Sequence, residues 1–161
     1  MSDQQTGAGP QRAPRLPPRW FVRTAWVVHR GYYRLTRGRR GLWPPHADKW
    51  GTLLLRTTGR RTDREHEVIV AYFEDGPALV TLAMNGWAAP EPAWWLNLQA
   101  HPDAVVVTRA GSRQVRAREA HGEERDRHWA TFRRLGTDVD GFSPRRPHTA
   151  VVVLEPRTRD R

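Results

Sequence analysis

The stretch LLLRTTGRRTDREHEVIVAYF, residues 53–73, contains two apolar runs separated by a short polar segment with two adjacent arginines. Both apolar runs are rich in β-branched and aromatic residues, which favour strands over helices. The segment between them, TGRRTDRE, has the glycine and small polar residues that are typical of a turn. The sequence therefore predicts a β-hairpin over residues 50–73, with Arg60 and Arg61 at its tip.

The rest of the chain continues this pattern of short strands. It predicts a strand over 78–84, a helix over 92–101, a hairpin over 104–120, a helix over 122–135 and a final strand within 148–156. No helix is predicted between the first three strands, which argues against parallel strand–helix–strand units. We therefore expect a mainly β fold, an antiparallel barrel or rolled sheet with peripheral helices.

The positive charge is concentrated near the N-terminus. Of the formal net charge of +10 on the 161 residues, residues 1–43 contribute +8. Residues 1–18 lack apolar periodicity and are typical of a disordered tail. Residues 19–43 form a basic arm, in which helical spacing predicts an amphipathic helix over 19–37. We expect three parts: the tail, the arm and a barrel domain over 44–161.

Composition restricts the location and the partners. The chain has no cysteine, which excludes disulfides, thiolate metal sites and a thiol nucleophile. Its apolar runs are too short to span a bilayer, and no signal-peptide core is visible, so we expect a cytoplasmic protein. The nearly balanced charge of the barrel domain argues against nucleic acid as a partner. The basic helix could instead lie on an anionic membrane surface at the inner face of the cell membrane, or pack on the barrel.

The paired arginines are candidate anion ligands. Guanidinium groups match phosphate and carboxylate geometry and do not deprotonate at working pH. Threonine hydroxyls and backbone N–H groups over 57–62 could complete an anion cradle around Arg60 and Arg61. The alternative is an ordinary solvated turn with charged side chains at its tip.

A second candidate site lies in MNGWAAPEPAWWLNL, residues 84–98. Aromatic rings and the close backbone approach that glycine permits both suit a planar heterocycle. The alternative is that the tryptophans pack in the core. Taken with the arginine pair, this segment suggests an elongated ligand with a ring at one end and anionic groups at the other. A metal site is not expected, because His121, Glu124 and His128 share a helical face without a further ligand.

Five blocks resemble one known family in order and spacing. They are LLLRTTGRRTDREHEV, YFEDG, NGWAAPEPAWWLNLQAHPDAVV, EERDRHW and VVVLEP, and they cover residues 50–156. They resemble the deazaflavin-dependent nitroreductase family, whose members are FMN-binding-like split β-barrels that bind coenzyme F420. The resemblance implies an F420H2-dependent oxidoreductase that transfers hydride to a small electron-poor acceptor, such as a quinone, an enone or a nitro compound.

The resemblance also implies which residues hold the cofactor. The phosphate and glutamate tail would lie at the hairpin tip, and the deazaflavin ring would lie against the second strand, the end of the third strand and the following helix. The implied tail ligands are Arg60, Arg61, Thr62 and, where the family has arginine, His66. The implied ring contacts are Glu67, Val68, Ile69, Val70, Leu82, Ala83, Met84, Asn85, Ala93, Trp94, Trp95, Leu96 and Asn97. No catalytic side chain or proton donor is identified.

Two departures from the family pattern bear on the substrate. Met84 and Asn85 replace a Ser-Lys pair of a nitroimidazole-reducing member, and the tyrosine-rich segment of that member has no counterpart in residues 133–146. We therefore expect poor reduction of nitroimidazoles. The residues leave three alternatives open: an F420-binding or storage protein without catalysis, a membrane or nucleic-acid binding module without cofactor, and a barrel that binds FMN or haem. The oligomeric state is not predicted.

Overall fold

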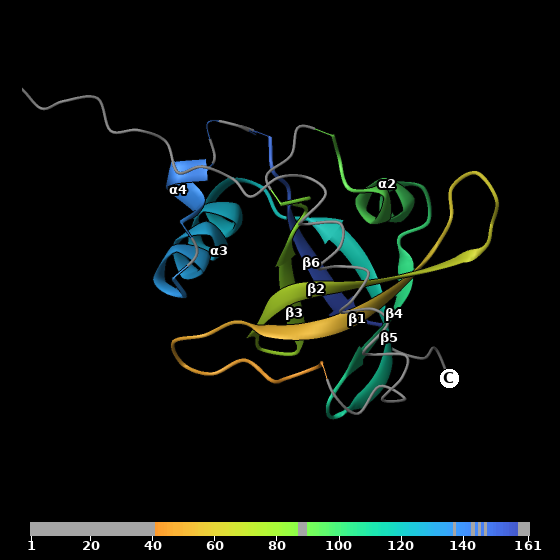
Figure 1. The fold of residues 1–161 in the computed structure, drawn as a ribbon, viewed down its shortest axis with the longest axis horizontal. Helices are drawn as coiled ribbons and strands as arrows, with labels where there is room; N and C mark the ends of the chain where they lie inside the picture. The colour runs from red at the N-terminus through yellow and green to blue at the C-terminus, as the bar shows by residue number, and fades with distance from the viewer. Residues whose placement is uncertain are drawn as a thin grey trace, which may run out of the picture.

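The computed structural model describes residues 41–86, 90–136, 138–142, 144, 146 and 148–157. Within these residues, strands close into an antiparallel barrel in the order β1-β2-β3-β6-β5-β4 (Figure 1). The strands are β1 (Gly51–Thr58), β2 (Glu65–Asp75), β3 (Ala78–Leu82), β4 (Asp103–Thr108), β5 (Gly111–Glu119) and β6 (Val151–Pro156). The prediction of a mainly β antiparallel barrel is confirmed.

The quoted hairpin pairs β1 with β2 along the whole length of β1. The register runs from Gly51 opposite Tyr72 to Thr58 opposite Glu65, which places residues 59–64 in the connecting loop. The predicted hairpin is therefore confirmed, with Arg60 and Arg61 in its loop.

The N-terminal predictions fall on residues that the structure does not describe. Both the tail over 1–18 and the helix over 19–37 lie outside the described residues, which begin at Gly41. Among the residues that are described, no helix is long and apolar enough to cross a membrane.

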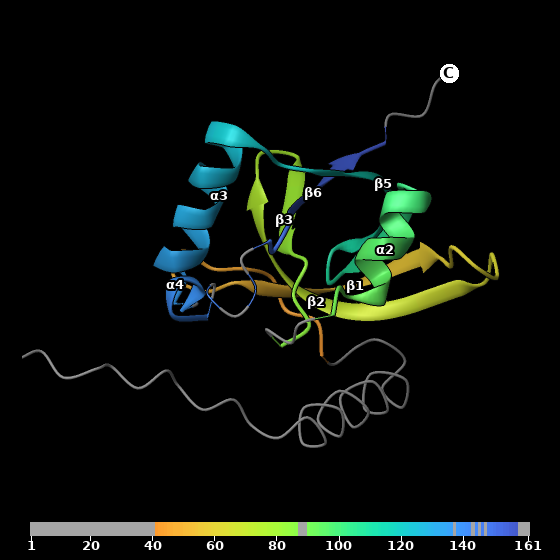
Figure 2. The ribbon, with the colours of Figure 1, turned by 90° about the horizontal axis from the view of Figure 1, so that it is seen from above.

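Three helices accompany the barrel in the described part of the chain. They are α2 (Ala93–Ala100), α3 (Gly122–Arg134) and α4 (Val139–Phe142). Figures 1 and 2 show α2 and α3 on opposite sides of the barrel, with the β1–β2 loop on the side of α2. The first two were predicted, whereas α4 was not, because a four-residue helix is too short to produce an apolar period. Asp138 marks its start, since its Oδ1 accepts a hydrogen bond from the Gly141 N–H at 2.9 Å.

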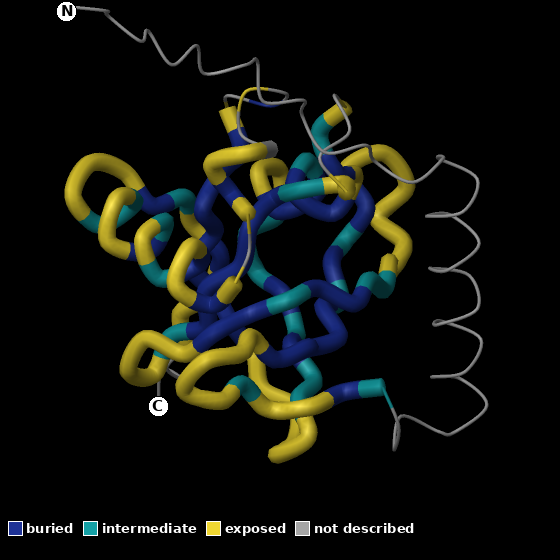
Figure 3. Tube along the Cα trace, turned by 60° about the vertical axis from the view of Figure 1, so that its left-hand side comes forward, coloured by how far each residue is buried: buried dark blue, intermediate teal, exposed yellow. Residues whose placement is uncertain are grey.

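Alternation along the strands sends every second side chain into the barrel. Figure 3 shows buried stretches following the strands, and exposed residues gather at the hairpin turns. The interior cluster includes Leu53, Leu55, Val70, Tyr72, Leu79, Val106, Val115, Val152 and Leu154. Trp94, Trp95 and Leu98 of α2 belong to the same cluster, so this helix helps to close the barrel core.

The outer face of the barrel is covered in two places. On one side, Phe132 and Leu135 pack with Leu82, Val151 and neighbouring apolar side chains of β2, β3 and β6. On the other side, a small cluster joins Leu42 to β1 and β2. Leu42, just before β1, therefore packs on the barrel, whereas the domain bounds expected from the sequence remain predictions.

Candidate functional site

The loop between β1 and β2 is held closed by its own backbone. The Gly59 N–H donates to the Arg64 carbonyl at 2.8 Å, and the Asp63 N–H donates to the Gly59 carbonyl at 2.8 Å. Asp63 takes a positive φ of 53°, which aspartate tolerates better than most residues. A Cβ added to Gly59 would lie 2.7 Å from Nε2 of His66, so the imidazole lies directly against the start of the loop. These contacts give the loop a defined shape.

Three of the implied tail ligands, Arg60, Arg61 and Thr62, are exposed at the tip of this loop. Arg60 is oriented toward α2, because its Nη1 and its backbone N–H both donate to Oδ1 of Asn97, at 3.3 Å and 3.2 Å. Within the described part of the chain, Arg61 forms no ion pair. The tip thus presents guanidinium groups to solvent, an arrangement that can bind phosphate or carboxylate.

The threonine hydroxyl at the end of β1 does not face this tip. Thr57 is buried, with 2% of its surface exposed, and its Oγ1 accepts a hydrogen bond from Nδ2 of Asn97 at 3.3 Å. The sequence suggested that this hydroxyl could contribute to an anion cradle. The structure instead uses the Thr57 hydroxyl to bind α2, whereas the side chains of residues 60–62 are exposed at the tip.

The implied contacts on β2 divide between the two faces of the strand. Val68 and Val70 belong to the interior cluster. Glu67 lies on the opposite face, where its Oε1 accepts a hydrogen bond from Nε of Arg56 at 2.9 Å, and Ile69 packs in the outer cluster with Leu42. Because successive side chains of a strand point to opposite faces, this run cannot line one site with all its side chains.

The end of β3 shows the same division. Ala83 belongs to the interior cluster, whereas Leu82 and Met84 pack with the cluster beneath α3. Asn85 is exposed at the point where the chain leaves the strand. Of the implied ring contacts in this segment, the Asn85 side chain is therefore the one that is open to a ligand.

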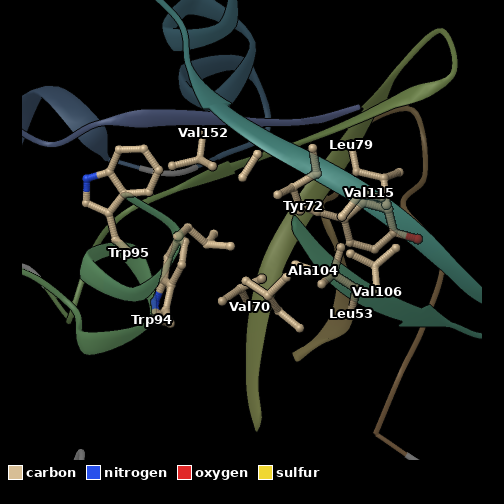
Figure 4. Packing of buried hydrophobic residues seen from close by; sticks show 14 of the residues in the cluster. Leu53, Val70, Tyr72, Leu79, Trp94, Trp95, Ala104, Val106, Val115 and Val152 are labelled. Atoms are coloured by element: carbon tan, nitrogen blue, oxygen red, sulfur yellow. The ribbon is translucent and has the colours of Figure 1, made fainter. Parts of the chain in front are cut away.

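The two tryptophans of α2 are core residues in this structure. Trp94 and Trp95 are 7% and 5% exposed, and their rings meet edge to face with centroids 6.4 Å apart. Figure 4 shows both indoles projecting from α2, with Val70 and Val152 beside them. For Trp94 and Trp95 the structure shows the packing alternative, whereas Trp87 lies outside the described residues. On α2, Ala93 is exposed and Leu96 is half-buried, so these side chains are the more accessible to a ligand.

Sequence reasoning missed an ion pair that ties down the segment before α2. Arg146 is 4% exposed, and its Nη2 lies 2.6 Å from Oε1 of Glu91. The pair connects the segment leading into α2 with the segment leading into β6. A buried arginine is rarely maintained without a partner, so this pair restricts where α2 begins. In an arginine-rich chain nothing marks Arg146 as different from the exposed arginines.

His128 of α3 packs against β2 in this structure. Among the described residues, no three His, Cys, Asp or Glu side chains are grouped closely enough to hold a metal ion. His128 is buried against Phe73, with the ring centroids 5.7 Å apart, and burial lowers its pKa. Glu124 is engaged by Arg118, whose hydrogen bonds hold the pKa of that carboxyl below its usual value.

Most of the implied site residues fall into three sets, and His66, Asn85, Ala93 and Leu96 are exposed or half-buried outside them. The hairpin tip and α2 are joined directly through Arg60 and Asn97. A second set shares the interior cluster: Val68, Val70, Ala83, Trp94 and Trp95. A third set has side chains on the outer face of the barrel: Glu67, Ile69, Leu82 and Met84. As cofactor contacts, all of these residues remain predictions.

The site is thus a closed antiparallel barrel whose arginine-bearing hairpin tip is bonded to a short helix. The model of the F420H(2)-dependent quinone reductase family matches residues 26–156. The chain therefore belongs to the F420H(2)-dependent quinone reductase family. The resemblance seen in the sequence was to deazaflavin-dependent enzymes, and that assignment is confirmed.

Individual relatives agree with the family match. An F420H(2)-dependent quinone reductase of Mycobacterium tuberculosis is 36% identical over 92 residues, which cover 55% of this chain and 60% of the relative. A Mycobacterium bovis relative matches equally, at 36% identity over the same number of residues. The matched segment thus spans less than two thirds of these relatives.

Solved structures support the fold. A structure described as an F420-H2 dependent reductase superposes with a TM-score of 0.58 at 22% identity, covering 65% of this chain and 93% of that chain. The heme storage protein of Vibrio cholerae gives a TM-score of 0.50 at 14% identity, covering 66% of this chain and 82% of its own. At such identities the likeness concerns the fold alone, because one fold hosts several cofactors.

Proposed function

We propose that this protein is an F420H2-dependent reductase that transfers hydride from the reduced deazaflavin to a quinone-like acceptor. The family match over residues 26–156 is the observation that carries the proposal. The exposed arginines of the hairpin tip agree with it, because the cofactor has an anionic phosphate and glutamate tail. When bound, the deazaflavin supplies the hydride chemistry, and the chain supplies binding and orientation.

In this proposal the tip binds the tail. Arg60 and Arg61 donate charge-assisted hydrogen bonds to phosphate or carboxylate oxygens, with Thr62 and the His66 imidazole beside them. Ala93, Leu96 and backbone groups at the start of α2 lie toward the ring, together with Asn85. The indoles of Trp94 and Trp95 act indirectly, since they hold α2 in the barrel.

Among the described residues that this proposal places beside the ring, Ala93, Leu96 and Asn85, none carries a side-chain acid for the acceptor. Asn85 can orient a carbonyl oxygen through its amide, but an amide does not deliver a proton at neutral pH. In this account, the proton that accompanies hydride transfer to a quinone comes from solvent. The acceptor is held mainly by the cofactor face and by apolar contacts, and this suits quinones and enones.

The proposal predicts a substrate order. Quinones and enones should oxidise F420H2 faster than bicyclic nitroimidazoles, because residues 133–146 contain a single aromatic residue, Phe142, where a nitroimidazole-reducing relative has several tyrosines. The measurement is the rate at which oxidised cofactor appears with each acceptor, corrected for the rate without protein. Faster turnover of the nitroimidazole would contradict the assigned substrate preference. Binding without turnover of any acceptor would indicate a cofactor-binding or storage protein.

We also propose, from the sequence, that the basic arm brings the barrel to an anionic membrane surface at the inner face of the cell membrane. Nine arginines within residues 1–43 support this proposal, since each basic residue near such a surface contributes about 1 kcal/mol.

The full chain should co-sediment with anionic vesicles at low salt and not with neutral ones. A variant lacking residues 1–40, which keeps Leu42 on the barrel, should lose this binding and keep the cofactor. Equal sedimentation of both proteins would contradict the proposal.

A further inference from the structure

The side chain of Asn97 is a buried amide whose partners all belong to the hairpin. Asn97 is 4% exposed on the barrel side of α2, between the core residues Trp94 and Leu98. Burying an amide without partners is costly, so its hydrogen bonds decide whether α2 can lie here. Oδ1 accepts from the N–H and from Nη1 of Arg60, and Nδ2 donates to Oγ1 of Thr57.

These contacts fix both the place and the direction of one arginine. The bond to the Arg60 N–H positions the backbone at the start of the loop, and the bond to Nη1 directs the guanidinium. The backbone bonds between Gly59 and Arg64 and between Asp63 and Gly59 are internal to the loop. A second, exposed contact reaches the loop from the end of α2, where Nε2 of His101 lies 3.7 Å from Oδ1 of Asp63. Asn97 is therefore the buried side chain that ties Arg60 at the tip to α2.

We propose that Asn97 is a positioning residue that holds Arg60 ready for the anionic end of the cofactor, and so couples binding at the tip to the placement of α2. The proposal rests on the proposed function, in which Arg60 binds the cofactor tail. Asn97 itself does not touch the cofactor. It acts through Arg60, whose guanidinium keeps other N–H groups free for a phosphate or carboxylate oxygen.

An amide suits this role better than a carboxylate. A neutral Oδ1 orients the guanidinium without neutralising it, whereas a carboxylate at this position would form an ion pair with Arg60 and compete with the ligand. The exchange keeps the size and shape of the side chain but replaces the buried Nδ2 donor to Thr57 with a carboxylate oxygen. Circular dichroism and chemical denaturation of Asn97→Asp therefore accompany the binding test, so that positioning is measured on a folded variant.

The test compares full-length F420 with the ribityl deazaflavin, which lacks the phosphate and glutamate tail. Fluorescence titration should show that Asn97→Asp weakens F420 binding by at least about tenfold, the effect of losing one charge-assisted contact. Binding of the tail-less ribityl deazaflavin should change by less than about twofold. The matched control Gln99→Glu adds the same charge to an exposed position of α2 and should leave both affinities unchanged.

The possible outcomes are distinct. If Asn97→Asp lowered the affinity for both ligands equally, Asn97 would act on α2 alone and the positioning role would be overturned. The role would also be overturned if Gln99→Glu lowered F420 affinity as much as Asn97→Asp does. Unchanged F420 affinity in Asn97→Asp, with reduced affinity in the Arg60 and Arg61 alanine variant, would overturn the inference and leave the proposed function intact. Failure of the unaltered protein to bind either ligand would overturn both.

Discussion

Replacing Arg60 and Arg61 together with alanine should weaken F420 binding by at least about tenfold. Hydrogen bonds to charged groups contribute roughly 1.5–3 kcal/mol each, and 1.4 kcal/mol corresponds to a factor of ten in affinity. Both side chains are exposed at the hairpin tip, so their removal should not disturb the core. Fluorescence titration of the variant and of the unaltered protein measures the loss directly.

A second pair of arginines provides a matched control for charge. Arg109 and Arg113 are exposed around the turn between β4 and β5. Their double replacement by alanine removes the same charge from a different hairpin and should leave the affinity nearly unchanged. If the two double variants lose affinity equally, the effect is general electrostatics and the tip is not a specific clamp. Unchanged affinity after loss of Arg60 and Arg61 would also contradict the clamp.

Replacing Trp95 with alanine should lower the free energy of unfolding by about 3–5 kcal/mol, the usual cost of truncating a buried aromatic residue. Trp95 is 5% exposed and packs with the interior cluster at one end of the barrel, so truncation leaves a cavity there (Figure 4). Chemical denaturation followed by circular dichroism measures the change.

Trp50 is the matched control, because its side chain is an exposed tryptophan, 37% accessible, just before β1. Trp50→Ala should change the free energy of unfolding by less than about 1 kcal/mol, as expected for a surface substitution. A Trp95→Ala variant of unchanged stability that no longer bound cofactor would show that the indole is a ligand contact and not a core residue.

The sequence contained most of the fold because its signals are local. The apolar runs on either side of Arg60 and Arg61 define two strands, and the loop between them has turn chemistry. The predicted hairpin over residues 50–73 begins one residue before β1 (51–58) and ends two residues before the end of β2 (65–75). Strand periodicity and glycine-containing turns depend on neighbouring residues, so they can be recognised without the tertiary structure.

The direction of side chains was harder to predict. The resemblance implied the whole run from Glu67 to Val70 as ring contacts, but the strand sends Glu67 and Ile69 to the outer face. A family pattern records which positions lie near a site, and it does not separate side-chain from backbone contacts. If Val68 and Val70 had been assigned to the inward face, the alternation of side chains along β2 would have placed Glu67 and Ile69 on the outer face.

Contacts between distant segments could not be predicted at all. The Glu91–Arg146 pair joins residues that are far apart in the sequence, and so do the hydrogen bonds of Asn97 to Thr57 and Arg60. Asn97 was implied as a cofactor contact, whereas its side chain faces the hairpin. Such pairings depend on how α2 lies on the barrel, which single-sequence patterns do not specify.

Whether this barrel binds a deazaflavin can be measured by titrating the unaltered protein with F420, FMN and haem. Absorption and fluorescence spectra report binding of each, and gel filtration shows which remains bound. We expect saturable binding of F420, with FMN and haem much weaker, because the tip arginines match the longer anionic tail. Tight binding of FMN or haem together with no binding of F420 would show that the barrel is not a deazaflavin site.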